Sequence, residues 1–247
     1  MANFLFKKSY RLSNFKKTTY DHLWGSTGVF TTIRLFGKEP KFVLLDEHIF
    51  KLNKSLKKLN IPFSLTRNKL LDLMPHNLSI KKYDHLLRVA IKKNIISLSL
   101  RPRLPPKKNF QCKLIKYQRS NPSIKNLQYN KILSLQKGID MQKEEILFFH
   151  NKNLLEGSTT NLIVIKNNNI FLPKGNLYRG ITLEFLLSKI GNVSVKSPAI
   201  LDALRLSPTL NKPTFCIKIT LGEVSSIVFL PLTFFLLVLK YFTYFFL

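Results

Sequence analysis

One proline-rich stretch constrains the fold of this chain more than any other feature. Residues 101–108 read Arg-Pro-Arg-Leu-Pro-Pro-Lys-Lys. Each proline fixes φ and lacks a backbone N–H, so neither a helix nor an interior strand can continue through this stretch. A chain of 247 residues is long enough for two modest domains. We therefore predict a small domain over residues 1–106 and a larger one over residues 107–247.

The part before the prolines is predicted to be mixed α/β. Segments rich in β-branched, aromatic and aliphatic residues alternate with a segment whose apolar residues repeat every three or four positions. The expected elements are a strand at 28–36, a strand at 41–45, a helix at 47–59 capped by Asp46, a helix that begins near Thr66, and paired strands at 86–91 and 95–100.

The part after the prolines is predicted to be a β-rich α+β domain. Its expected elements are a strand at 110–117, a helix at 127–137, strands at 145–149 and 162–165, a reversal at 167–169 before a strand at 170–172, and a helix from Gly180 to Ile190.

The last residues of the chain, 227–247, are almost entirely apolar and are interrupted by Pro231 and Lys240. About 20 apolar residues can span a bilayer, so a membrane anchor is one interpretation. A lysine inside such a span costs roughly 3 kcal/mol. We therefore expect a buried terminal helix of the second domain rather than an anchor.

The chain is strongly basic, with 40 Lys and Arg against 13 Asp and Glu, a net charge of +27. The basic residues are scattered and accompany no nucleic-acid recognition motif or aromatic platform, so we do not expect a nucleic-acid partner. The charge agrees with a small anionic substrate. Cys112 and Cys216 have neither CxxC spacing nor nearby histidines, so they predict no disulfide framework and no metal site. Without an N-terminal apolar run, a cytoplasmic location is expected.

Lys125 and Glu156 carry the two functional groups that a pyridoxal 5'-phosphate (PLP) site needs. A lysine can form a Schiff base with an aldehyde cofactor, and a carboxylate can keep a pyridine nitrogen protonated. Either residue alone is more often exposed and solvated. The residues around the pair change that estimate.

Four motifs between residues 24 and 225 resemble the class IV aminotransferases, which are the fold type IV PLP enzymes. Gly28–Arg34 is similar to Gly-x-Phe-Glu-Thr-x-Arg, with Thr31 at the glutamate position. Glu47–Leu52 resembles Glu-His-x-x-Arg-Leu, with Lys51 in place of the arginine. Glu156–Leu162 resembles Glu-Gly-x-x-x-Asn-Leu, and Leu177–Thr182 resembles Leu-x-Gly-Ile-Thr.

This resemblance implies a two-domain fold, with a small α/β N-terminal domain and a larger, β-rich pseudo-barrel C-terminal domain. It implies that Lys125 forms the Schiff base with PLP and that Glu156 binds the ring nitrogen. Asn161 stands at the structural asparagine of the family.

The resemblance also implies how the phosphate is held. Lys51 replaces the phosphate-binding arginine as a point charge. Ile181 and Thr182 open a helix whose N–H groups, with the Thr182 hydroxyl, form a phosphate cup. Leu183 stands where the family commonly has arginine. Residues 206–211 are expected to supply a second phosphate-binding turn.

Three activities fit this family: 4-amino-4-deoxychorismate lyase, D-amino-acid aminotransferase and branched-chain aminotransferase. Thr31, the compact Lys125–Gln128 segment, residues 222–225 and the short chain resemble the lyase. The lyase releases pyruvate and the folate precursor 4-aminobenzoate. A homodimer is expected by analogy. A degenerate, non-catalytic relative and a basic binding protein are the alternatives.

Overall fold

In a computed structural model of the chain, residues 4–75, 80–107, 111–151, 153–166, 169–190, 215–217 and 226–231 are described. They fall into two units. The first unit contains the residues up to Arg103 together with Ile124–Lys131, and the second contains Leu104–Ser123 and the residues from Ile132 onward. The segment that carries Lys125 therefore returns to the first unit. The predicted domain limits, 1–106 and 107–247, stay a prediction.

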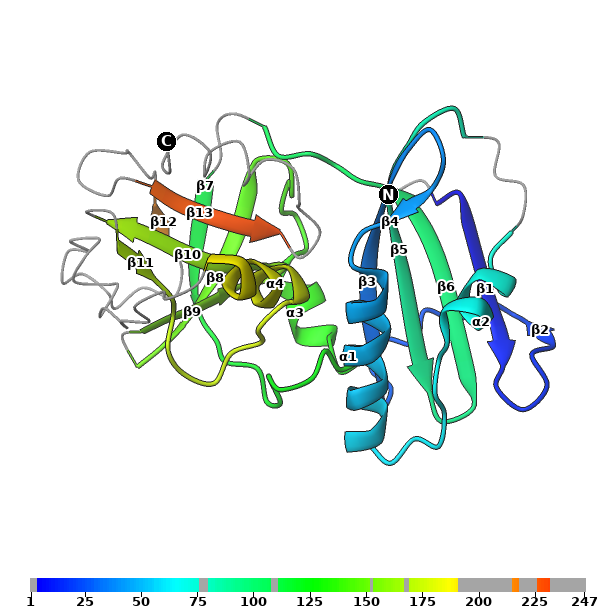
Figure 1. The fold of residues 1–247 in the computed structure, drawn as a ribbon. Helices are drawn as coiled ribbons and strands as arrows, with labels where there is room; N and C mark the ends of the chain where they lie inside the picture. Colours follow the sequence, from blue (N-terminus) through cyan, green and yellow to red (C-terminus); the bar gives the residue numbers. More distant parts are fainter. Residues whose placement is uncertain are drawn as a thin grey trace. The chain divides into compact units, whose positions relative to one another are not determined.

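The first unit is built on a six-stranded antiparallel sheet with the strand order β2-β1-β6-β5-β3-β4. Its elements are β1 (Phe6–Arg11), β2 (Lys17–Thr18), β3 (Gly28–Gly37), β4 (Lys41–Phe42), α1 (Leu45–Lys58), α2 (Arg67–Asp72), β5 (Tyr83–Lys92) and β6 (Ile95–Pro102). Helix α1 lies along β3, as Figure 1 shows.

The core of the first unit lies between α1 and one face of the sheet. Helix α1 buries Ile49, Leu52 and Leu56 against Val29 and Ile33 of β3. Alternate strand residues point to the same face, so Thr31 is on the helix side and Phe30 is on the opposite side. The predicted apolar stripe of the helix is confirmed.

The start of α1 differs from the prediction that Asp46 caps it. The residue before the helix is Leu44, with a φ of 51° and no side-chain capping bond, and Asp46 lies in the first turn. Strand β4 ends at Phe42, because the chain then turns left-handed into the helix. Asp46 still favours the helix, since its negative charge is near the positive end of the helix dipole. Thr66 caps α2 as expected, accepting a bond from Lys69 N.

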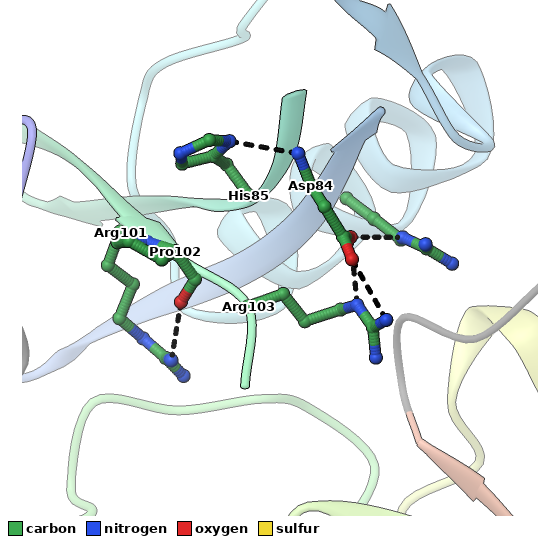
Figure 2. Close-up of polar contacts among 6 residues, drawn as sticks. Asp84, His85, Arg101, Pro102 and Arg103 are labelled. Atoms are coloured by element: carbon green, nitrogen blue, oxygen red, sulfur yellow. Dashed lines mark hydrogen bonds and ion pairs between the residues drawn. The ribbon is translucent and has the colours of Figure 1, made fainter. Parts of the chain in front are cut away.

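The proline-rich stretch 101–108 does not end the strand at once, because β6 continues through Pro102, which pairs with His85. The missing N–H of Pro102 falls at the end of the strand, where its loss is tolerated. An ion-pair cluster holds this end of the sheet together: Asp84 of β5 binds Arg34 at 3.0 Å and Arg103 at 2.8 Å (Figure 2).

The second unit contains two sheets. A four-stranded sheet has the order β12-β7-β8-β9, with β7 and β8 parallel, and a three-stranded antiparallel sheet has the order β11-β10-β13. The elements are β7 (Gln111–Lys116), α3 (Asn130–Leu135, which starts in the first unit), β8 (Glu144–His150), β9 (Asn153–Gly157), β10 (Thr160–Lys166), β11 (Asn169–Phe171), α4 (Ile181–Ile190), β12 (Phe215–Ile217) and β13 (Ser226–Pro231). The predicted α+β class is confirmed.

Two elements of this region correct the sequence prediction. Helix α3 begins at Asn130 rather than Leu127, because Leu127 N donates to Gly28 O at 2.9 Å and so belongs to a strand-like contact. The apolar tail begins as strand β13, which pairs with β10, and the rest of the expected terminal helix falls on residues outside the described ones. Residues 232–247 lie outside the described residues, as do 206–211 and 222–225.

Two further findings concern the membrane and the cysteines. None of the helices that the structure describes is both long and apolar enough to cross a bilayer. Cys112 is buried in the second unit, where burial and the charge of Glu145 raise the pKa of its thiol to about 12. It is a small core residue.

Candidate active site

Lys125 is fixed to the edge of β3. Strand β4 pairs only with the far end of β3, so the Gly28–Thr31 end has an open edge on that side. The segment from Lys125 to Leu127 fills it, since Phe30 N donates to Lys125 O at 2.9 Å and Leu127 N donates to Gly28 O at 2.9 Å. These bonds satisfy the exposed backbone groups of the edge. They hold the backbone of Lys125 beside a rigid strand.

Gly28 allows this close approach. A Cβ at this position would run into the carbonyl of Ile91 and lie 2.8 Å from a methyl carbon of Leu127. Any larger residue would push the Lys125–Leu127 segment away from β3. The first glycine of the sequence motif therefore serves the placement of the lysine.

Thr31 and His48 form a buried polar pair in the same unit. The Thr31 hydroxyl lies 2.6 Å from His48 Nδ1, and both side chains are buried between β3 and α1. Burial and the positive charges of Lys125 and Lys51 lower the pKa of His48 to about 3. The imidazole is therefore neutral at physiological pH. Lys51 follows His48 on the next turn of α1.

Two cations share the aromatic ring of Phe30. Lys125 Nζ lies 4.9 Å from the ring centroid, and the Arg88 guanidinium carbon lies 5.4 Å from it. Trp24 and Tyr129 pack on the same ring at 4.8 and 5.3 Å, and Arg88 also covers the Trp24 ring at 3.7 Å. Burial lowers the pKa of Arg88 to about 10. The Lys125 amine thus sits in an aromatic and cationic neighbourhood.

Glu156 lies in the second unit, with its carboxylate buried. Its Oε1 accepts bonds from Arg119 Nε at 2.9 Å and from Tyr178 N at 3.2 Å. Leu155 is an extra residue in the pairing of β9 with β8, directly before Glu156. Such a bulge changes the direction of the side chains beside it. The ion pair and the backbone donor favour the ionised carboxylate.

A second buried carboxylate, Glu145, supports the turn after Glu156. Its Oε1 accepts a bond from Ser158 Oγ at 2.6 Å, and its Oε2 accepts one from Thr159 Oγ1 at 2.8 Å. Gly157 must be a glycine here, because an added Cβ would collide with the Thr160 hydroxyl and lie 3.2 Å from the Glu145 carboxyl carbon. The turn is therefore held rigidly behind Glu156.

Asn161 connects this turn to the start of α4. Its amide donates to Tyr178 O at 2.6 Å and accepts from Gly180 N at 2.7 Å. These two bonds fix the loop that leads into Ile181 and Thr182, which are buried at the N-terminus of the helix. Helix N-termini offer unpaired N–H groups and a partial positive charge, which suit a phosphate.

The predicted site residues therefore fall into two groups. Lys125 and Lys51 lie in the first unit, and both are close enough to act on the His48 charge. Glu156, Asn161, Ile181 and Thr182 lie in the second unit, linked through the loop at Tyr178.

Sequence reasoning missed three residues of these groups. Arg119 had no predicted role, and the structure makes it the ion-pair partner of Glu156. His48 and Glu145 were also missed. Polar residues inside apolar segments, such as Glu145 before Ile146 and Leu147, were the signal that could have revealed them.

A protein-family model matches the part of the chain that contains these residues. The model of the amino-transferase class IV family matches residues 28–200, from the glycine of β3 to beyond the helix that follows the Asn161 loop. The chain belongs to the class IV aminotransferase family. Members of this family are PLP-dependent transaminases or lyases.

Similar proteins agree with this family. A Methanocaldococcus jannaschii protein that bears the name branched-chain-amino-acid aminotransferase is 24% identical over 200 residues, which is 70% of this chain and 68% of the relative. The branched-chain aminotransferase of Thermoproteus uzoniensis, solved with norvaline, has a TM-score of 0.59 and 17% identity, with 74% of each chain covered. A Legionella pneumophila protein described as a 4-amino-4-deoxychorismate lyase has a TM-score of 0.53 and 20% identity, covering 71% of this chain and 75% of its own. These structures show the fold.

The side chains of this class IV member have the chemistry that PLP needs. Lys125 supplies an amine for the aldehyde, and Glu156, with Arg119 beside it, supplies a negative acceptor for a protonated ring nitrogen. In the second unit the start of α4 has N–H groups that suit a phosphate, and in the first unit Lys51 has a cationic group that suits one as well. The donor set therefore fits the cofactor.

Proposed function

We propose that this protein binds PLP and acts as a 4-amino-4-deoxychorismate lyase. The observation that carries the proposal is the fixed position of Lys125 on the edge of β3. Its carbonyl accepts a bond from Phe30 N, and Phe30 is next to Thr31 in the strand. An amine held in this way can act at the same substrate carbon in each turnover.

When bound, PLP provides an electron sink next to the substrate amine. Lys125 holds the cofactor before the substrate arrives and then removes the proton from the carbon that carries the amine. The bond from the ring carbon to the enolpyruvyl oxygen breaks, and the departing three-carbon unit gains a proton at its methylene carbon to become pyruvate. The ring has lost the proton of its amine-bearing carbon and the enolpyruvyl group, and the aromatic product is 4-aminobenzoate.

Two other residues support the choice of a small anionic amino substrate. Arg88 shares the Phe30 ring with Lys125, and its Nε is a buried atom with no hydrogen-bond partner within the described part of the chain. A carboxylate would satisfy this donor. Thr31 stands at the glutamate position of the family motif. Its side chain is uncharged and so does not repel an anionic substrate.

Cofactor binding is tested first. Purified protein mixed with PLP is expected to gain visible absorbance, and borohydride is expected to fix the cofactor on a peptide that contains Lys125. Lys125→Ala abolishes the fixation, whereas Lys131→Ala, which changes an exposed residue of α3, keeps it. Fixation that persists in Lys125→Ala contradicts the assignment of the lysine.

The reaction is tested next. Incubation with 4-amino-4-deoxychorismate is expected to release 4-aminobenzoate and pyruvate in equal amounts. If neither product forms but amino acids turn over only when a keto acid is present, the protein is a transaminase.

A branched-chain or D-amino-acid transaminase is the second candidate. It is favoured by the names of the Methanocaldococcus jannaschii and Thermoproteus uzoniensis relatives. It would use the same Lys125 to move a proton within the substrate. Turnover of valine against a keto acid, compared with both enantiomers of alanine, separates the two transaminase types.

The proposal also includes a homodimer, since the family resemblance implies one. Sedimentation equilibrium of the purified protein measures the mass of the assembly. A mass of one chain at micromolar concentration contradicts this part of the proposal and leaves the lyase assay unaffected.

A further inference from the structure

A chain of hydrogen bonds in the second unit connects the buried carboxylate of Glu145, in β8, to that of Glu156, in the adjacent strand β9. Glu145 Oε1 accepts a bond from the Ser158 hydroxyl at 2.6 Å. The Ser158 carbonyl accepts a bond from Arg119 Nη2 at 3.0 Å, and Arg119 Nε donates to Glu156 Oε1 at 2.9 Å. The Arg119 guanidinium is therefore held on one side by the turn that contains Ser158 and on the other side by Glu156.

Glu145 fixes this turn with both of its oxygens. Oε1 also accepts a bond from Ile146 N at 2.9 Å, and Oε2 accepts one from Thr159 Oγ1 at 2.8 Å. The Ser158 hydroxyl, which donates to Glu145, accepts a bond from Gln136 Nε2 at 2.8 Å. A carboxylate accepts at both oxygens, whereas an amide accepts at only one. A glutamine in place of Glu145 therefore leaves one of the two hydroxyl donors without its acceptor.

The position of the turn matters for Glu156, because the Arg119 guanidinium bridges the two. Glu156 Oε1 has bonds from Arg119 Nε and from Tyr178 N. Ser158 is fully buried, so its carbonyl is a fixed acceptor for the other side of the guanidinium as long as the turn keeps its place. In such a network the loss of one member weakens the bonds of the next.

We propose that Glu145 is a positioning residue for Glu156. By fixing Ser158 it sets the Arg119 guanidinium, and Arg119 in turn holds the Glu156 carboxylate in one orientation for the ring nitrogen of the cofactor. Glu145 itself contacts only the turn and its own strand in these bonds. The catalytic meaning of this inference rests on the proposed function, but the positioning can be measured without cofactor.

Amide hydrogen exchange of the protein without cofactor tests the positioning. The reporter is the Tyr178 N–H, which donates to Glu156 Oε1 at 3.2 Å. The reference is the Tyr117 N–H, which donates to Phe149 O at 3.1 Å and makes none of the bonds above. Glu145→Gln is expected to make the reporter exchange about tenfold faster or more relative to the reference. Equal acceleration of both amides shows a general loss of stability and overturns the inference.

Two further variants sharpen this test. Ser158→Ala removes the hydroxyl that binds Glu145 and is expected to accelerate the Tyr178 N–H in the same way, so it decides the question if Glu145→Gln does not fold. Glu144→Gln is the matched control, because this neighbouring carboxylate binds Lys113 at 2.8 Å instead, and it is expected to leave the exchange of the reporter unchanged. Unchanged exchange in Ser158→Ala, or equal acceleration in Glu144→Gln, overturns the inference.

Turnover tests the consequence for catalysis. Glu145→Gln is expected to lower kcat with bound PLP about tenfold, because the group it positions is displaced. In a Glu156→Gln background the same change is expected to lower kcat less than about twofold, since its effect acts through Glu156. A residue that only stabilises the fold causes the same loss in both backgrounds, and that result overturns the inference.

These outcomes separate the inference from the proposed function. Absence of borohydride fixation on Lys125 in the wild type contradicts the proposed function and leaves the exchange result standing. Fixation and product release, together with unchanged Tyr178 exchange in both Glu145→Gln and Ser158→Ala, support the proposed function and overturn the inference.

Discussion

Asp84 and Glu156 both bind arginine side chains, and their surroundings are opposite. Asp84, at the start of β5, has a side chain that is 41% exposed and binds both Arg34 and Arg103 (Figure 2). Glu156, in β9, has a side chain that is 4% exposed and binds Arg119 and the backbone N–H of Tyr178.

The comparison shows what an ion pair does in each setting. Water screens Asp84, and its second arginine remains if one is removed, so the cluster joins strand ends without being essential. Glu156 has been removed from water at a high cost, which is tolerated only because its partners are in place. A buried pair of this kind is weak evidence for stability but strong evidence for a site that needs a fixed charge.

The largest expected difference is in catalysis. If the proposed function holds, Glu156→Gln is expected to lower turnover with bound PLP by about a hundredfold or more, because it removes the negative charge that would keep the ring nitrogen protonated. Asp84→Asn, the matched change, leaves turnover nearly unchanged. Steady-state rates, normalised to the bound cofactor from its absorbance, make the comparison. Equal losses in both variants would remove the functional distinction between the two carboxylates.

The next difference is in stability. Arg119→Met leaves Glu156 buried without its charged partner and is expected to cost about 3–5 kcal/mol of unfolding free energy. Arg103→Met leaves Asp84 with Arg34 and is expected to cost less than about 1 kcal/mol. Urea unfolding followed by circular dichroism measures both. Similar midpoints for the two variants would show that burial does not decide the strength of these pairs.

The residue that follows each carboxylate also differs. Gly157 follows Glu156 in a crowded turn, whereas His85 follows Asp84. Gly157→Ala is expected to cost about 1–3 kcal/mol, because the added methyl group collides with Thr160 and crowds Glu145. Gly138→Ala is the control. Its φ of 83° strains a side chain, but no atom lies within 4 Å of the added carbon, so about 1 kcal/mol is expected. Thermal unfolding gives both values.

The smallest effect is the acid response of Asp84. Partial burial raises the pKa of Asp84, but the hydrogen bonds and charges of Arg103 and Arg34 outweigh this and lower it. The stabilisation is therefore present above the unfolded value, near pH 4, and is lost as the pH falls through the lower folded value. It is also expected to weaken in 1 M salt.

His48 must be separated from this acid response. Its pKa of about 3 lies below the ordinary value of 6.5, so the unfolded chain binds a proton first and stability falls as the pH drops from 6.5. Urea unfolding of Asp84→Asn and the parent, both in a His48→Gln background, isolates the carboxylate. A difference between them that persists unchanged at pH 2 contradicts the ion-pair explanation.

The sequence predicted most strands and helices, because the first unit has regular apolar patterns. The stripe at Ile49, Leu52 and Leu56 specified α1, and the β-branched run at 28–36 specified β3. The predicted ends of helices were wrong where backbone contacts with distant residues override the local preference of the sequence. Leu127 pairs with Gly28 and so cannot begin a helix, and the left-handed turn at Leu44 makes Asp46 a first-turn residue.

By itself the sequence determined the α+β class, the order of most of the elements and the motif positions of Lys125, Glu156, Asn161 and Thr182. The class and the elements follow from periodicity and from neighbours in the chain, which local chemistry dictates. The positions of the four residues follow from the motifs that resemble the class IV family. Only the tertiary structure decided that Arg119 pairs with Glu156, that His48 is neutral beside Thr31, and that the open edge of β3 takes Lys125. Hydrogen-bond partners and burial arise from segments far apart in sequence, and packing alone brings those segments together.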